Sequence, residues 1–125
     1  MSFVSSLGTN AALKDFSNVA TWRFGSGTIS SYIKFNNGLL ICWGWMGRIS
    51  LETKMVYLPL SFANDAYKVT LTSEASTSAG TTLISLTVNN KTVSSFKVKG
   101  AFHTVDVASG YPSDPFDWFA IGNWK

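Results

Sequence analysis

The sequence predicts an all-β fold, an antiparallel β-sandwich of about seven or eight short strands, preceded by a short lead-in that can hold a helix. Two observations predict it. Runs rich in aromatic and β-branched residues recur along the chain and are separated at intervals by Gly, Pro, Asn and Asp. Within several of these runs apolar and polar residues alternate, as they do in a strand with one buried face. At 125 residues, the chain is long enough to build one hydrophobic core without disulfides.

The composition narrows the class of protein. Charged residues make up 14% of the chain, well below the roughly 25% of typical soluble domains. Interface cores are depleted in charge and rich in aromatic side chains, so we expect part of the surface to be hidden in an oligomer. Ten basic and seven acidic residues give a net charge of +3, and the basic ones are scattered along the chain. This pattern argues against nucleic-acid binding.

The chain has no pattern typical of a secretion signal or a membrane span. Residues 1–7 have no basic start and no sustained apolar run. The longest apolar stretch, residues 38–47, is about half as long as a membrane span. We therefore expect a soluble chain that is made in a cytoplasm and does not insert into a membrane.

Residues 1–27 form the expected lead-in or stalk segment, and residues 28–125 form the expected β-sandwich domain. The lead-in is small and polar, with widely spaced bulky residues. Asn10 can cap a short helix over residues 11–16. So short a helix needs a surface to pack on, because it is marginal alone in water.

Residues 31–45 predict a β-hairpin around which the domain is organised. The Asn-Gly pair at 37–38 tolerates the positive φ that both central positions of a type I′ turn require. A two-residue turn there predicts that Phe35 faces Leu40 and that Ile33 faces Cys42. Both faces of the outgoing strand are largely apolar, so each face needs a cover. We expect a second sheet on one face and another copy of the chain on the other.

The lone Cys42 lies within this apolar hairpin and is interpreted as a small buried hydrophobe. A single cysteine excludes an intrachain disulfide and a cysteine-based zinc cluster.

Further strands follow the hairpin. Pro59 ends the first of them, because proline cannot donate to a strand ladder, and Phe62 anchors the next turn. A second hairpin turns at residues 89–91. The strands predicted here are residues 53–60, 67–73, 82–88, 92–99 and 101–107. The residues expected to point inward are Tyr67, Val69, Leu71, Ile84, Leu86 and Val88.

The chain closes on residues 116–124, which predict a strand that is apolar on both faces. One face carries Trp118, Ala120 and Trp124, and the other carries Phe119 and Ile121. A chain terminus normally frays. The two apolar faces therefore predict that this strand lies in the middle of a sheet.

Four motifs occur in a fixed order: YIKFNNGLLICWG at 32–44, LPLSF at 58–62, YKV at 67–69 and FDWFAIG at 116–122. In this order and spacing they resemble the C-terminal domain of bacteriophage tail fibre proteins. The resemblance spans residues 29–124. It implies a β-sandwich that forms a homotrimer at the distal end of a virion tail fibre. It also implies contact with a bacterial surface polysaccharide or outer-membrane component, and it does not imply an enzyme.

Exposed loops offer candidate receptor contacts, because an aromatic ring beside hydrogen-bonding groups is typical of recognition of a polar ligand. The candidates are Trp45, Arg48, Tyr111, Asp114 and His103. Trp43, Trp118 and Trp124 are interpreted instead as core or interface anchors.

No motif predicts a catalytic residue, a cofactor or a metal site. His103 has no recognisable triad motif around it, although in a trimer three copies of it could converge on the axis and hold a metal. Asp114 and Asp117 could in principle be a glycosidase pair. Because they bracket a proline turn, they are interpreted as capping that turn.

The sequence thus favours a non-enzymatic, homotrimeric fibre tip that binds a bacterial surface receptor, most simply a polysaccharide, and joins the rest of a tail fibre or tail. A free-standing, lectin-like carbohydrate-binding module is the alternative binding hypothesis. A structural trimerisation cap without a receptor is the alternative assembly hypothesis.

Overall fold

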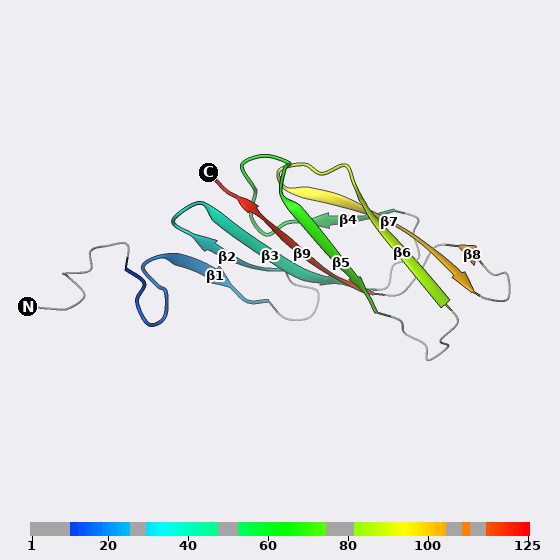
Figure 1. Ribbon diagram of the computed structural model, residues 1–125, viewed down its shortest axis with the longest axis horizontal. Coiled ribbons are helices and arrows are strands. Elements are labelled where there is room, and N and C mark those ends of the chain that lie inside the picture. The colour runs from blue at the N-terminus through cyan, green and yellow to red at the C-terminus, as the bar shows by residue number, and fades with distance from the viewer. Residues whose placement is uncertain (1–10, 26–29, 48–52, 75–81, 105–108, 111–114) are drawn as a thin grey trace, which may run out of the picture.

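The computed structural model describes residues 11–25, 30–47, 53–74, 82–104, 109–110 and 115–125. This part of the chain contains nine strands and no helix, and all its strand pairs are antiparallel (Figure 1). The strands are β1 (Ala20–Arg23), β2 (Ser31–Phe35), β3 (Leu39–Met46), β4 (Thr53–Tyr57), β5 (Lys68–Ser73), β6 (Thr82–Asn89), β7 (Ser95–Thr104), β8 (Ser109–Gly110) and β9 (Phe116–Asn123). The predicted all-β, sandwich-like fold is confirmed.

The strands form two sheets. The larger has five strands in the order β1-β2-β3-β9-β5, and the smaller has the order β4-β7-β6, with β8 pairing β7. The C-terminal strand β9 lies between β3 and β5, and its eight-residue pairing with β3 joins segments far apart in the sequence (Figure 1). The expectation that the closing strand lies inside a sheet is therefore confirmed.

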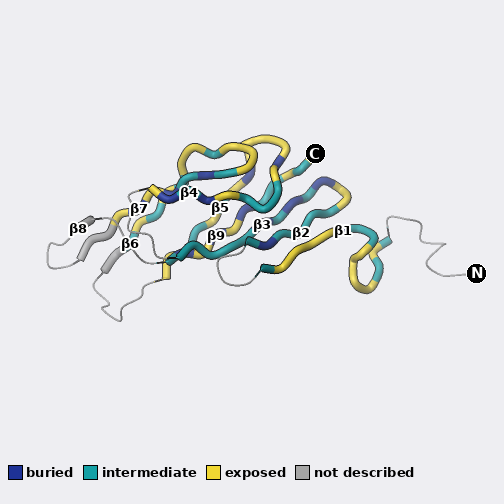
Figure 2. The backbone as a smooth tube through the Cα atoms, turned by 180° about the vertical axis from the view of Figure 1, so that it is seen from behind, coloured by how far each residue is buried: buried dark blue, intermediate teal, exposed yellow. Residues whose placement is uncertain are grey.

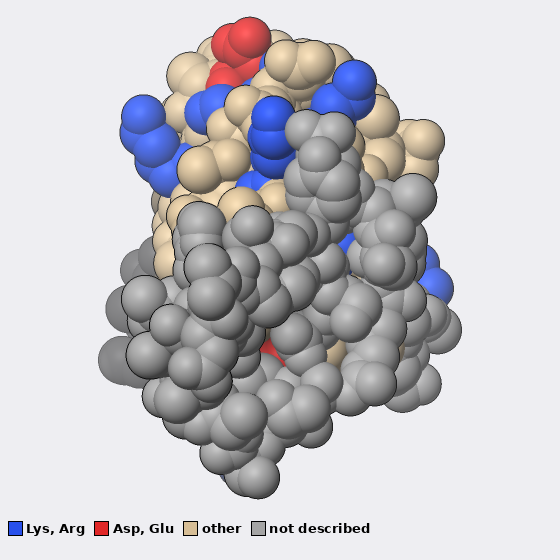
Figure 3. All heavy atoms as spheres, turned by 90° about the vertical axis from the view of Figure 1, so that its right-hand side faces the viewer, with Lys and Arg blue, Asp and Glu red and all other residues tan. Residues whose placement is uncertain are grey.

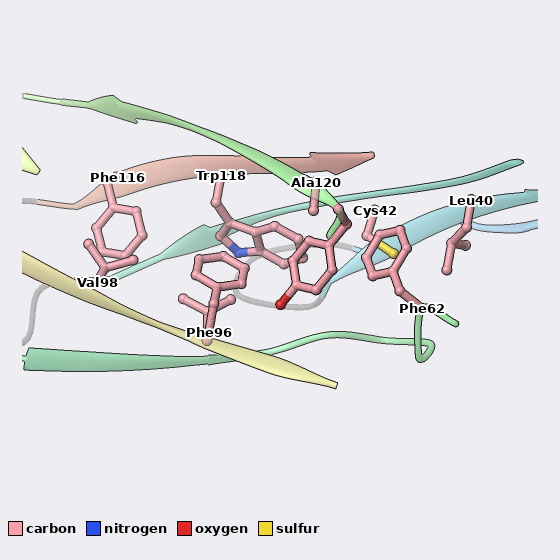
Figure 4. Packing of buried hydrophobic residues seen from close by; sticks show 10 residues of the cluster. Leu40, Cys42, Phe62, Phe96, Val98, Phe116, Trp118 and Ala120 are labelled. Carbon is pink, nitrogen blue, oxygen red and sulfur yellow. The ribbon is translucent and has the colours of Figure 1, made fainter. Parts of the chain in front are cut away.

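The core lies between the two sheets. Figure 4 shows side chains from β3 and β9 pointing toward side chains from β7. The buried set is Leu40, Cys42, Val56, Phe62, Tyr67, Phe96, Val98, Phe116, Trp118 and Ala120. The Trp118 and Phe96 rings meet edge to face, with centroids 5.7 Å apart. Each large side chain buried in this way contributes about 1.5–3 kcal/mol to folding, so these rings are a main source of stability.

Burial alternates along the first part of β9, so that Trp118 and Phe119 lie on opposite faces as the sequence predicted. Phe116, Trp118 and Ala120 are buried, whereas the intervening Asp117 and Phe119 are exposed. The predicted burial of Cys42 and the anchoring role of Phe62 are also confirmed, at 0% and 4% exposure.

The predicted register of the first hairpin is wrong by one residue. Lys34, not Phe35, pairs with Leu40, and Tyr32 pairs with Cys42. Side chains on β2 therefore point to the faces opposite to those predicted. Ile33 and Phe35 lie on the face away from the core.

The cause of the shift is the turn. Residues 36–38 form a three-residue loop in which the Gly38 N–H donates to the Phe35 carbonyl at 3.1 Å. Gly38 has a φ of +107°, whereas Asn37 is not among the residues with positive φ, so the type I′ geometry is not formed. The Asn37 side chain instead accepts the Leu39 N–H at 3.1 Å. A side-chain bond thus selects the longer loop.

The predicted helix over residues 11–16 is absent from the described part of that segment, which forms turns. The Asn18 side chain accepts the Leu13 N–H at 2.9 Å and donates to the Ala11 carbonyl. The second bond occupies the Ala11 carbonyl, which a helix would pair internally. Phe16, with a φ of 60°, further departs from helical geometry.

Part of the predicted lead-in joins the sheet. Strand β1 lies within residues 1–27 and pairs with β2 from Ala20, opposite Phe35, to Arg23, opposite Tyr32. In the second hairpin, the predicted strands 92–99 and 101–107 are one strand, β7, over the described residues. Its buried Gly100 pairs with Leu86 and does not interrupt it.

Candidate functional site

The larger sheet has one face packed on the core and one face turned away from it, which we call the outer face. Because side chains alternate along a strand, the neighbours of buried Leu40, Cys42, Trp118 and Ala120 point outward. Cross-strand pairs extend this assignment to the neighbouring strands. The large apolar residues of the outer face are Trp22, Ile33, Phe35, Leu39, Ile41, Trp43, Trp45, Phe119 and Ile121.

The outer face is half-exposed over much of its area. Trp22 and Phe119 are 38% and 41% exposed, and Figure 2 shows β1 exposed over most of its length. Phe24, just after β1, is 65% exposed and its ring lies 5.7 Å from the ring of Trp43. On β1, β2 and β3 this face carries no charged residue. A soluble monomer rarely leaves so large an apolar surface in water.

One half of the outer face contains an apolar groove. Its volume is about 190 Å³, and Phe16, Ala20, Trp22, Ile33 and Phe35 line it. Phe16 comes from the turn before β1 and is 51% exposed. The groove therefore offers mainly aromatic rings and aliphatic groups to an occupant.

The other half of the outer face contains a mixed cleft of about 330 Å³, which we call the aromatic–carboxylate cleft. Two cross-strand rows form it. Trp43, Phe119 and Thr70 pair in one row across β3, β9 and β5. Asp117 and Thr72 pair in the next row on the same face. Gly44 and Trp118, which pair with each other between these rows, complete the lining.

A second carboxyl group lies beside this cleft. Glu74 follows β5, and its N–H donates to the Pro115 carbonyl at 2.9 Å, which holds it next to the start of β9. The hydrogen bond between the Glu74 and Asp117 side chains, together with the negative charge of Asp117, raises the pKa of Glu74. The rim of the cleft therefore has an acidic character and can share a proton.

Outside the cleft, the described side chains include a buried thiol and charged groups on the surface. No group of three or more His, Cys, Asp or Glu side chains that could hold a metal ion occurs among the described residues. Burial raises the pKa of the Cys42 thiol to about 12, which keeps it protonated and unreactive at neutral pH. Figure 3 shows Lys and Arg side chains at several places on the visible surface, with uncharged residues between them. The described residues include no helix long and apolar enough to cross a membrane.

The predicted receptor residues are only partly placed. Trp45 lies on β3, paired with Asp117, so it extends the carboxylate row of the cleft. His103 lies on β7 of the smaller sheet, paired with Leu83 and Ser109, and thus on a different sheet from Trp45. Its side chain is not described. Arg48, Tyr111 and Asp114 lie outside the described residues.

Sequence reasoning missed the residues that line the cleft from β5 and β9. In the sequence, Thr70 and Thr72 are the polar residues of a strand that alternates between polar and apolar side chains. Phe119 was recognised as facing away from Trp118, but its row partners depend on the β3-β9-β5 order, which no local pattern contains. The sequence signal that could have identified Phe119 as a surface residue was its large apolar side chain on the strand face opposite Trp118.

Comparison with known protein families identifies a family for this chain. The family model described as "Putative tail fiber protein gp53-like, C-terminal" matches residues 34–123, most of the chain, from the end of β2 to the end of β9. The chain belongs to this tail fibre family. The predicted resemblance to C-terminal tail fibre domains is thereby confirmed. No curated protein matches the sequence.

Solved pyocin fibres share the fold of this tail fibre domain. The N-truncated R2-type pyocin tail fibre, solved with selenomethionine, superposes with a TM-score of 0.62 at 17% identity over 96% of the present chain. The P. aeruginosa R2 pyocin fibre comprising C-terminal residues 323–691 gives a TM-score of 0.61 at 17% identity over 96% of the chain. The domain spans 47% and 32% of those two chains, so it corresponds to a part of each fibre.

Proposed function

We propose that this tail fibre domain is the tip of a fibre, where it assembles as a homotrimer and attaches a virion or pyocin-like particle to a polysaccharide on a bacterial surface. In this proposal it is made in the cytoplasm of the bacterium that produces the particle and joins the rest of a tail fibre. It acts by binding and performs no catalysis.

The observation that carries the proposal is the outer face. Its rings and aliphatic side chains on β1, β2 and β3 have the composition of an interface core, which is rich in aromatic residues and depleted in charge. The chain as a whole is poor in charge, at 14%. In a fibre built from several copies of the chain, a second copy can cover this apolar surface. Three copies around a fibre axis bury the same surface on each copy.

The proposed attachment is supported by the number of sites that such an assembly would present. Three copies on one fibre present three sites at high effective concentration, so individually weak contacts add to firm binding of a repetitive surface. A polysaccharide is such a surface.

The test is binding of the fluorescently labelled chain to a panel of intact bacteria, with purified surface polysaccharide as competitor. Trp22→Lys places a charge on the outer face at a residue that is already 38% exposed, so the fold of each copy should survive. We expect it to lose cell binding along with assembly. Tyr57→Lys is the matched control, because Tyr57 is 72% exposed and lies on β4 of the smaller sheet.

Wild-type chain that binds no cells would support a structural cap instead. Release of reducing sugar from the polysaccharide by the wild-type chain would contradict the non-enzymatic part of the proposal.

A further inference from the structure

We propose that the aromatic–carboxylate cleft binds one pyranose ring that carries no negative charge, as a unit of the surface polysaccharide. The inference rests on the proposed function and deepens it, because it assigns the attachment contact to particular residues of β3, β5 and β9. The assembly surface then occupies the β1-β2 half of the outer face, and the sugar site occupies the β9-β5 half.

The first row of the cleft suits the apolar face of a sugar. Phe119 is 41% exposed on β9, and Trp43 is its cross-strand partner on β3. The C–H groups of a pyranose form a weakly positive surface that packs on the negative face of an aromatic ring. The Phe24 ring, at 5.7 Å from Trp43 and tilted by 55°, packs beside the indole and restricts its orientation.

The second row suits the hydroxyl edge of the same ring. Residues two apart on one strand lie about 6.7 Å from each other, so Asp117 stands roughly one pyranose width from Phe119. The Asp117 carboxylate accepts hydrogen bonds from sugar hydroxyls, and the hydroxyls of Thr70 and Thr72 both donate and accept. The cleft thus pairs an aromatic wall with a polar wall across one ring.

The acidic groups at the cleft favour sugars without a negative charge over anionic ones. Asp117 lies in the cleft, and Glu74, hydrogen-bonded to it, adds a second acidic group at the rim. A uronic acid or a phosphorylated sugar would meet these carboxylates at close range, and like charges in contact are unfavourable. Neutral hexoses and amino sugars meet no such penalty.

The volume and the position are consistent with a binding site. The cleft measures about 330 Å³, at the small end of the roughly 300–1,000 Å³ of ligand sites in general. Its rows lie on three paired strands at the centre and edge of the larger sheet, so the backbone that carries them is fixed by two ladders. Rigid strands hold contact residues more firmly than loops do.

The test uses the full chain and simple probes. Saturation-transfer NMR is recorded with the methyl glycosides of glucose, galactose and N-acetylglucosamine, and with methyl glucuronoside as the anionic probe. We expect at least one neutral glycoside to give a saturation-transfer signal. In a separate heteronuclear spectrum of the protein, that glycoside should shift the indole N–H signal of Trp43. Glucuronoside should bind more weakly than the glucose probe.

Two variants locate the site. Phe119→Ala removes the stacking ring, and we expect it to weaken binding by about five- to tenfold. Asp117→Asn keeps the size of the side chain and should reduce the discrimination against glucuronoside. Tyr57→Ala is the control, since it removes an aromatic ring that is even more exposed, at 72%, from the smaller sheet and should leave binding unchanged. Far-UV circular dichroism checks that each variant is folded.

The outcomes separate this inference from the proposed function. Neutral glycosides that bind Phe119→Ala and Asp117→Asn as tightly as wild type would overturn the cleft while leaving attachment to polysaccharide intact. Equal binding of glucose and glucuronoside probes would overturn the electrostatic selection. Cell binding without any glycoside binding would overturn the assignment of the cleft as a sugar site, but not the proposed attachment to the host. Absence of both would overturn the two proposals together.

Discussion

Replacing Gly44 with alanine places a methyl group against the indole of Trp118. A Cβ built on Gly44 lies 2.7 Å from Cζ2 and Nε1 of that ring and 2.8 Å from Cε2, all well inside van der Waals contact. The indole has little room to retreat, because it is 3% exposed and meets Phe96 edge to face. Overpacking of this kind costs about 1–3 kcal/mol. At about 4 °C per kcal/mol for a chain of this size, we expect Tm to fall by about 4–12 °C.

Urea denaturation at fixed protomer concentration measures this cost, and a double-mutant cycle identifies its cause. Trp118→Leu removes the indole ring whose atoms the new methyl would meet. Gly44→Ala should therefore cost at least about 1 kcal/mol less in the Trp118→Leu background than in wild type. Equal costs in the two backgrounds would refute the steric reasoning and point to backbone effects at Gly44 instead.

Two further predictions concern single polar contacts. The Tyr67 hydroxyl lies 2.8 Å from the Thr92 carbonyl oxygen and 2.9 Å from the Ser95 carbonyl oxygen, at the two ends of the 92–95 turn. Tyr67→Phe should therefore lower the free energy of unfolding by about 1–2 kcal/mol, measured by thermal or urea unfolding. Tyr57→Phe, at an exposed site, should leave the free energy of unfolding unchanged. The pKa of Glu74 is raised by its hydrogen bond to Asp117, so protonated Glu74 stabilises the fold at acid pH and this stabilisation is lost as pH rises through the raised pKa. Glu74→Gln keeps a donor at every pH and should raise Tm slightly at pH 7 but not at pH 3, and an equal change at both would contradict this.

The sequence predicted the elements whose signal is local. Alternation on residues 67–73 placed Tyr67 inward, and the structure buries it, at 2% exposure. The two-sided apolar pattern of the closing strand predicted its place inside the sheet, and β9 lies between β3 and β5.

The errors occurred where one side-chain bond decided between two backbone geometries. Asn37 is compatible with a two-residue or a three-residue turn, and its bond to the Leu39 N–H selects the longer one and shifts the register of β2. Asn18 likewise takes backbone groups from the segment expected to be helical. Neither choice changes the hydrophobic pattern, so the pattern could not reveal it.

The candidate site was the least predictable part. Sequence reasoning looked for a receptor site in loops, whereas the described structure offers a cleft on the strands themselves. Phe119, Thr70 and Trp43 come from three strands that only the β3-β9-β5 order brings side by side. That order depends on contacts distant in sequence, and alternation along a single strand contains no information about it.

The claim that most needs a direct test is that other copies of the chain cover the β1-β2 half of the outer face. Light scattering coupled to size exclusion tests it directly on the purified chain. We predict a mass three times the 13.6 kDa of one chain, and a fall to the single-chain mass for Trp22→Lys but not for Tyr57→Lys. A wild-type chain that elutes with the mass of one copy over the accessible concentration range would contradict the claim, since its outer face would then be stable in water.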